Sequence, residues 1–120
     1  MTASEYLGSY AEGWASGNAE TILQSAAKGY TFDDPSAGVI QRNDFQRYLS
    51  QLKETVARTR GGNTTDTPFM KLSHVVTQKE NEGITAWCWW EIPGTKLTGA
   101  GLINVGPDGV RSERIAYYTK

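Results

Sequence analysis

The stretch "GITAWCWWEIPGTKLTGAGLINVGPDGVRSERIAYYT", residues 83–119, decides the fold of this chain. The turn sequences "PGT" and "GPDG" divide it into three segments rich in β-branched and aromatic residues, a pattern typical of strands joined by hairpins. An earlier segment, "FMKLSHVVTQKE", residues 69–80, adds a further strand before the turn sequence "NEG". We therefore predict an antiparallel meander in the second half of the chain.

The first half predicts three helices. Thr2 and Glu5 have the spacing of a capping box, and Asn18 is a suitable N-cap for the second helix. Asn43 is the expected cap of the third, which precedes a polar loop at residues 61–68. Helices followed by a meander predict an α+β fold with the helices on one face of a curved sheet. The expected helices end at Gly17, at about Lys28 and before Gly61.

Alternation along the strands predicts which side chains share a face. Across "PGT", Cys88 and Trp90 face the same way as Gly99 and Gly101, and Trp87 and Trp89 face the opposite way with Leu102. If Pro107 and Asp108 form a two-residue turn, Arg114 and Tyr118 join the face of Gly101. A three-residue loop with a bulge would reverse that last assignment. His74 shares a side of its strand with Met70, Leu72 and Val76, which favours an inward position.

Composition narrows the class of protein. The chain has 120 residues and a net charge of −1, so a single domain over residues 1–120 is expected and nucleic acid is a poor partner. No apolar run is long enough to span a membrane. A single cysteine excludes an internal disulfide and favours the cytoplasm. With one cysteine and one histidine, no zinc site is expected, and no glycine-rich stretch matches a phosphate-binding loop.

Two adjacent acids in "YTFDDPSAG", residues 30–38, differ in expected orientation. Alternation places Asp34 inward with Tyr30 and Phe32, and places Asp33 toward solvent. An inward acid needs hydrogen-bonding partners or a raised pKa, which is typical of a functional site. The alternative is structural, because an Asp before a proline often ends a strand in an Asx turn.

The order of elements and the residues "YAEGWASGNAETI", "YTFDDPSAG", "IQRNDF" and "GPDGVRSERIAYY" resemble the nuclear transport factor two-like superfamily. Within it, the chain is most similar to the ketosteroid isomerase and SnoaL-like polyketide cyclase branch. The resemblance spans nearly the whole chain. It implies a cone-shaped curved sheet wrapped around the helices, with a pocket between them.

The same resemblance implies roles for individual residues. The general base of the isomerase precedes a proline in this strand, as Asp34 precedes Pro35, and its oxyanion-hole tyrosine corresponds to Tyr10. The second donor of that oxyanion hole, a protonated acid, falls on Gly101, which cannot donate. An aromatic residue of the isomerase pocket corresponds to Tyr118.

Further pocket candidates come from the strands and the first helix. His74 is a natural proton carrier at neutral pH, although a single strand histidine is often structural. Arg114, if inward, could stabilise an enolate, hold a carboxylate or pair with Asp34. We expect Tyr10, Asp34, His74 and Arg114 to be the catalytic residues. The expected pocket-lining residues are Trp14, Phe32, Trp90, Gly101 and Tyr118.

The resulting hypothesis is a cofactor-independent isomerase or cyclase in which Asp34 transfers a proton on an apolar carbonyl compound. One alternative is a hydrolase or lyase that uses Asp34 with Arg114 or His74. Another is a module that binds a ligand or dimerises without catalysis. Trp87, Trp89 and Leu102 form an outer apolar face that a homodimer would cover.

Overall fold

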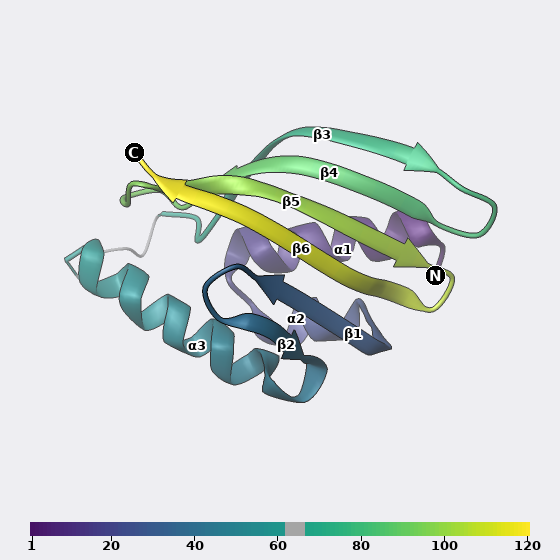
Figure 1. Ribbon diagram of the computed structural model, residues 1–120, viewed down its shortest axis with the longest axis horizontal. Helices are drawn as coiled ribbons and strands as arrows, with labels where there is room; N and C mark the ends of the chain where they lie inside the picture. The colour runs from purple at the N-terminus through teal and green to yellow at the C-terminus, as the bar shows by residue number, and fades with distance from the viewer. Residues whose placement is uncertain (62–66) are drawn as a thin grey trace.

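The computed structural model describes residues 1–61 and 67–120, so most of the loop expected at residues 61–68 lies outside the described part of the chain. Within the described residues the fold is α+β, with three helices packed against a six-stranded sheet (Figure 1). None of these helices is both long enough and apolar enough to cross a membrane.

The helices begin close to the expected caps. In α1 (Ala3–Ser16) the capping box is present, since Thr2 Oγ1 accepts from the Glu5 N–H and the Thr2 N–H donates to Glu5. Gly17 ends this helix at a φ of 70°, a left-handed conformation that glycine adopts without steric cost.

The other two helices depart from the expected boundaries. Helix α2 (Ala19–Gln24) has the expected Asn18 cap but is shorter than predicted, because residues from Ala26 on already pair in the sheet. Helix α3 (Arg42–Thr59) begins after Gln41, so the expectation that Asn43 would be its cap was wrong.

The sheet has the strand order β2-β1-β6-β5-β4-β3. All neighbouring strands are antiparallel except β1 and β6, which run parallel. In Figure 1 the long strands curve together and the sheet stays open between its two edge strands, β2 and β3. The strands are β1 (Ala26–Asp34), β2 (Gly38–Gln41), β3 (Lys71–Lys79), β4 (Ile84–Glu91), β5 (Leu97–Gly106) and β6 (Gly109–Thr119).

The β4–β5 hairpin confirms the facing predicted from "PGT". Cys88 pairs with Gly101 and Trp90 pairs with Gly99, and both pairs belong to the concave face that the helices cover. Trp87 pairs with Leu102 on the convex face. The helix side of the sheet therefore carries the even residues of β4.

The β5–β6 hairpin reverses the facing predicted from "GPDG". Gly106 pairs with Gly109 around the expected two-residue turn, but the pairing then shifts by one residue between Asn104 and Val105. The extra residue on β6 is Arg111, whose guanidinium covers the bare Cα of Gly106. A β-bulge of this kind turns every later side chain of the strand to the other face. As a result, the odd residues of β6 beyond the bulge face the helices.

Candidate functional site

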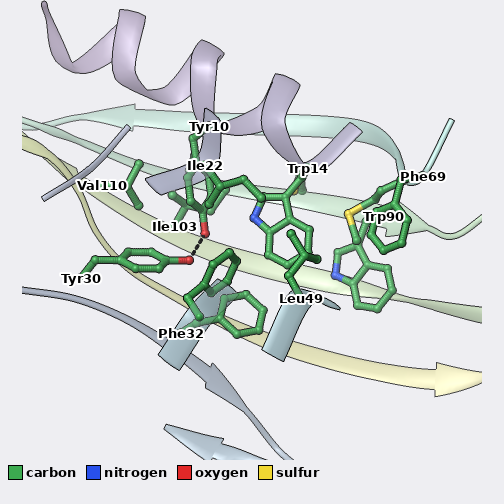
Figure 2. Close-up of a cluster of buried hydrophobic side chains, with 14 of the residues drawn as sticks. Tyr10, Trp14, Ile22, Tyr30, Phe32, Leu49, Phe69, Trp90, Ile103 and Val110 are labelled. Atoms are coloured by element: carbon green, nitrogen blue, oxygen red, sulfur yellow. Dashed lines mark hydrogen bonds between the residues drawn. The ribbon is translucent and has the colours of Figure 1, made fainter. Parts of the chain in front are cut away.

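A cavity of about 410 Å³ lies between α1, α3 and the concave face of the sheet. Its walls are almost entirely apolar, with contributions from α1, β4 and the cluster of buried side chains in Figure 2. The exposed residues of the wall all come from α1 and β3, so the cavity opens between these two elements. Those exposed residues are Ser4, Gly8, Val75, Thr77 and Lys79.

Glu113 of β6 is the polar centre of this cavity. Its side chain is only 6% exposed, and Glu113 Oε1 accepts a 2.6 Å hydrogen bond from the Tyr10 hydroxyl. The same hydroxyl lies 2.6 Å from the hydroxyl of Tyr30, which Figure 2 marks with a dashed line. Because Tyr10 donates its one proton to Glu113, Tyr30 is the donor to Tyr10. Two consecutive hydrogen bonds therefore connect Tyr30 to Tyr10 and Tyr10 to the Glu113 carboxyl group.

Burial controls the protonation of Glu113 and Tyr10. It raises the pKa of Glu113 to about 7, and the hydrogen bond from Tyr10 offsets only part of that effect. Burial, followed by the nearby charge of Glu113, raises the pKa of Tyr10 well above its usual value. Tyr10 is thus neutral at physiological pH, whereas both the protonated and the ionised forms of Glu113 are populated there.

Gly101 makes room for the Glu113 carboxyl. The two residues belong to adjacent strands, and a Cβ at position 101 would overlap Glu113 Oε2. Position 101 is where the family resemblance expects a protonated acid. In this chain the carboxyl group beside position 101 comes from Glu113 of the adjacent strand, β6.

Asp34 forms a second polar centre at the end of β1. It is also 6% exposed, but both of its carboxylate oxygens accept hydrogen bonds. Tyr48 of α3 donates to Oδ2 at 2.5 Å, and Tyr117 of β6 donates to Oδ1 at 3.1 Å. The N–H groups of Ser36 and Ala37 also donate to Oδ1, which closes an Asx-type turn.

The hydrogen bonds to Asp34 outweigh its burial. Burial acts to raise the pKa of Asp34, but the four donors stabilise the carboxylate and hold its pKa below the usual value. In turn, burial and the hydrogen bond to Asp34 raise the pKa of Tyr48. Asp34 is therefore ionised at neutral pH in the same cavity that contains the titrating Glu113.

Comparison with solved structures identifies the fold. A protein of unknown function from Burkholderia xenovorans, described as similar to nuclear transport factor 2 (NTF2), superposes with a TM-score of 0.67 at 14% identity, over 98% of this chain and 84% of that chain. This chain has the NTF2-like fold. No family model matches the sequence, and no curated protein matches it.

Two other solved structures with a similar fold have different descriptions. A candidate polyketide cyclase from Xanthomonas campestris has a TM-score of 0.63 at 16% identity, over 98% of this chain and 90% of that chain. A protein of unknown function with a cystatin-like fold, from Nostoc punctiforme, has a TM-score of 0.66 at 9% identity, over 96% of this chain and 87% of that chain. At these identities the likeness shows the fold alone.

Some residues expected at the site lie together on the NTF2-like cavity wall. Tyr10 and Trp14 of α1, Phe32 and Asp34 of β1 and Trp90 of β4 all line the cavity. Trp14 packs against Phe32 with ring centroids 5.4 Å apart. Gly101 itself is covered by Glu113 and does not line the cavity.

The expected inward positions of Arg114 and Tyr118 were wrong. The Arg114 side chain is 77% exposed and donates to Asp33 at 3.2 Å, while Tyr118 is 56% exposed. The bulge at Arg111 is the physical reason, because it places their odd-numbered neighbours inside. Asp33 was expected to face solvent, and its side chain is 35% exposed.

The inward position expected of His74 was also wrong. His74 lies in a second bulge, between Ser73 and Val76, with a φ of 53°. Its ring is exposed, and Nδ1 lies 3.2 Å from the hydroxyl of Ser73. Val75, Thr77 and Lys79 line the mouth of the cavity, and both Val75 and Val76 are largely exposed, at 57% and 62%.

Sequence reasoning missed the residues that complete both polar centres. The facing predicted from "GPDG" put Glu113 and Tyr117 on the face opposite Arg114 and Tyr118, and Tyr48 was not among the expected site residues. One signal was available in β6, since Ile115 shares the face of Glu113 and Tyr117. An apolar residue at that position favours an inward face for the odd residues.

Proposed function

We propose that this protein is a cofactor-independent enzyme of the isomerase or cyclase kind, which transfers a proton on an apolar carbonyl compound. The observation that supports this most directly is the buried Tyr30-Tyr10-Glu113 chain in the wall of an apolar cavity. Carboxyl groups whose environments push their pKa values apart are typical of acid and base pairs. Here those groups are Glu113 and Asp34.

In this proposal Glu113 is the acid. When Glu113 is protonated on Oε2, Tyr10 still occupies Oε1, and the carboxyl can donate to the carbonyl oxygen of a bound substrate. The Tyr10 hydroxyl is fully buried and already engaged by Tyr30 and Glu113. Tyr10 is therefore assigned as a positioning residue that acts through Glu113, and not as a direct donor to the substrate.

Asp34 is the proposed base. Phe32 pairs with Glu113, so Asp34 lies two residues, or roughly 7 Å, further along the adjacent strand and on the same face. This spacing suits a substrate whose carbonyl oxygen is at Glu113 and whose acidic C–H is at Asp34. Asp34 breaks the C–H bond and takes the proton, and Glu113 stabilises the enolate. Return of the proton to another carbon completes an isomerisation.

The test is proton exchange on a bicyclic enone in deuterated buffer, followed by NMR. We expect Glu113→Gln and Asp34→Asn each to slow exchange at least about 100-fold, the usual lower range for loss of a general acid or base. Arg114→Gln on the convex face is the control and should retain the wild-type rate. Undiminished exchange in both cavity variants would sink the proposal.

The positioning role of Tyr10 needs a separate measurement. The hydrogen bond from Tyr10 lowers the pKa of Glu113, so Tyr10→Phe should move the alkaline loss of the acid form to a higher pH. A purely structural tyrosine would change the exchange rate without moving its pH profile.

The rival enzyme hypothesis, in which Asp34 works with Arg114 or His74, requires contacts that these two exposed side chains do not make in the described structure. A module that only binds its ligand is the remaining alternative. The complete hydrogen bonding of Asp34 favours it, and such a module would bind enones without exchanging their protons.

The convex face supports a proposal about assembly. Trp87 and Trp89 pack edge to face with centroids 5.1 Å apart, and Leu102 beside them is 47% exposed. We propose that a second copy of the chain covers this surface, and a Trp89→Glu variant should then sediment as a monomer. The single, buried cysteine supports a cytoplasmic location, which is likewise a proposal.

A further inference from the structure

Both elements that border the mouth of the cavity contain a locally unfavourable residue. One is Gly8, an exposed residue in the interior of α1, where glycine weakens a helix relative to alanine. The other is His74 in β3, the only non-glycine residue with a positive φ in the described part of the chain. Such a backbone conformation costs free energy and is typically retained at functional sites. The mouth of the cavity is therefore the feature that these two residues have in common.

Packing does not explain the glycine at position 8. A second glycine of α1, Gly13, is explained by packing, because a Cβ there would lie 2.6 Å from Cγ1 of Ile22 in α2. A Cβ at Gly8 would meet no atom within 4 Å, and the φ of Gly8 is not positive. Neither close packing nor backbone conformation therefore requires glycine at this position. What distinguishes Gly8 is that it lines the cavity and is also exposed to solvent.

The bulge at His74 shapes the opposite side of the mouth. Beyond the bulge, Thr77 pairs with Ala86, a buried residue on the helix side of β4, and Val76 pairs with Trp87 of the convex face. Without the inserted residue, alternation along β3 would exchange the faces of Thr77 and Val76. The bulge therefore places Thr77, and not Val76, at the mouth.

We infer that Gly8 determines which molecules reach the cavity. Its missing side chain keeps the mouth between α1 and β3 wide, so that ligands are selected by their cross-section as they enter. A larger side chain at position 8 would narrow an opening that Val75 and Thr77 border on the other side. This role does not depend on the proposed function, because it concerns passage into the cavity and not the chemistry inside it.

Cys88 provides a way to measure this passage. It is the only cysteine of the chain, it lines the cavity, and it is 4% exposed. Two neutral reagents of different width, methyl and benzyl methanethiosulfonate, each convert its thiolate to a mixed disulfide and release methanesulfinate. Burial raises the pKa of this thiol to about 11, which slows both reactions alike because little thiolate is present. The ratio of the two rates, divided by the same ratio for the urea-unfolded protein, therefore reports the width of the entrance.

Gly8→Leu is the decisive variant, because leucine favours the helix and fills the open space at position 8. The benzyl reagent should react at least about tenfold more slowly and the methyl reagent less than about threefold more slowly, since entry rates among variants of one site span one to three decades. Glu12→Leu, at an exposed position of α1 that does not line the cavity, is the matched control and should keep both rates. An unchanged benzyl rate or equal slowing of both reagents would overturn the inference, as would a wild-type rate ratio equal to that of the unfolded protein.

Gly8→Ala separates access from stability. The added methyl group meets nothing within 4 Å and alanine favours the helix, so the midpoint of thermal unfolding should rise. The benzyl reagent should nevertheless react more slowly with this variant than with the wild type. A lower midpoint would mean that packing requires the glycine, and it would contradict the role in access. Proton exchange on the enone is scored separately, so a protein that selects reagents by width but exchanges no protons would refute only the proposed function.

Discussion

Asp34 and Glu113 are two acids of the same cavity with equal exposure, 6% each, and opposite protonation behaviour. Asp34 accepts four hydrogen bonds, and its pKa is lowered even though burial acts against ionisation. Glu113 accepts one side-chain hydrogen bond, from Tyr10, and its pKa rises to about 7. The comparison teaches that the balance between burial and hydrogen-bond donors decides which acid carries a proton at neutral pH, because the donors outweigh burial at Asp34 and do not at Glu113.

The largest expected effect is on the pH dependence of stability, and it comes from replacing Glu113, the acid with the raised pKa. The pKa of Glu113 is about 7 in the folded protein against 4.5 for the ordinary group, so its contribution to stability is fully present below about pH 4.5 and is lost as the pH rises to about 7. Between these limits the wild-type protein should lose on the order of 3 kcal/mol. Glu113→Gln should abolish this loss in chemical denaturation at several pH values. Glu12→Gln, at an exposed helical acid, should retain it.

A second change fills the space beside the Glu113 carboxyl. Gly101→Ala places a methyl group where Glu113 Oε2 lies, so the carboxyl must move and the Tyr10 hydrogen bond must distort. We expect unfolding to become easier by about 1–3 kcal/mol, the usual cost of overpacking. Gly29→Ala is the matched control, because a Cβ at that strand position meets nothing within 4 Å. Equal stability of the two variants would show that Glu113 does not need this space.

A third change makes Asp34 more like Glu113. Tyr48→Phe removes the 2.5 Å donor to Oδ2, so the pKa of Asp34 should rise toward its usual value, as carbon-detected NMR titration would show. Loss of a hydrogen bond to a carboxylate typically costs about 1–3 kcal/mol. The stability from Asp34 is present above its unfolded pKa and is lost as the pH falls through the folded pKa. Acid unfolding of Tyr48→Phe should therefore begin at a higher pH, whereas Tyr6→Phe, outside this network, should match the wild type.

The smallest effect is expected on the other face of the sheet. Arg114→Ala removes an ion pair with Asp33 in which the Arg114 side chain is 77% exposed. Exposed pairs contribute about 0–1 kcal/mol, so thermal unfolding should change little. A loss as large as that of Tyr48→Phe would mean that this face is buried in an assembly, which bears on the proposed homodimer.

Local patterns were sufficient to predict much of the fold. The capping box at Thr2 and Glu5, the glycine end of α1 and the Asn18 cap all depend on residues a few positions apart, and all are present. The pairing of β4 with β5 followed from period-two alternation across a short turn. The NTF2-like fold was expected from the family resemblance, and the solved neighbours confirm it.

The site was less predictable than the fold. The inward position of Asp34 followed from alternation within one strand, but its four donors come from α3, β6 and the turn after β1. Glu113 was missed because one inserted residue, Arg111, reverses the facing of the rest of β6. His74 was misplaced for the same reason by the bulge in β3. A bulge depends on contacts between strands, so a single strand's sequence does not reveal it.

By itself, the sequence determined the N-terminal caps of α1 and α2, the strands of the meander and the facing of β4 against β5, because these depend on hydrogen bonds and alternation over short distances along the chain. Only the tertiary structure decided which acid is protonated near neutral pH. That outcome depends on the two tyrosines, Tyr48 and Tyr117, that packing brings to Asp34 and on the deep burial of Glu113 with Tyr10 as its one side-chain donor. It also depends on a glycine in the adjacent strand, whose missing side chain leaves the space that the Glu113 carboxyl occupies.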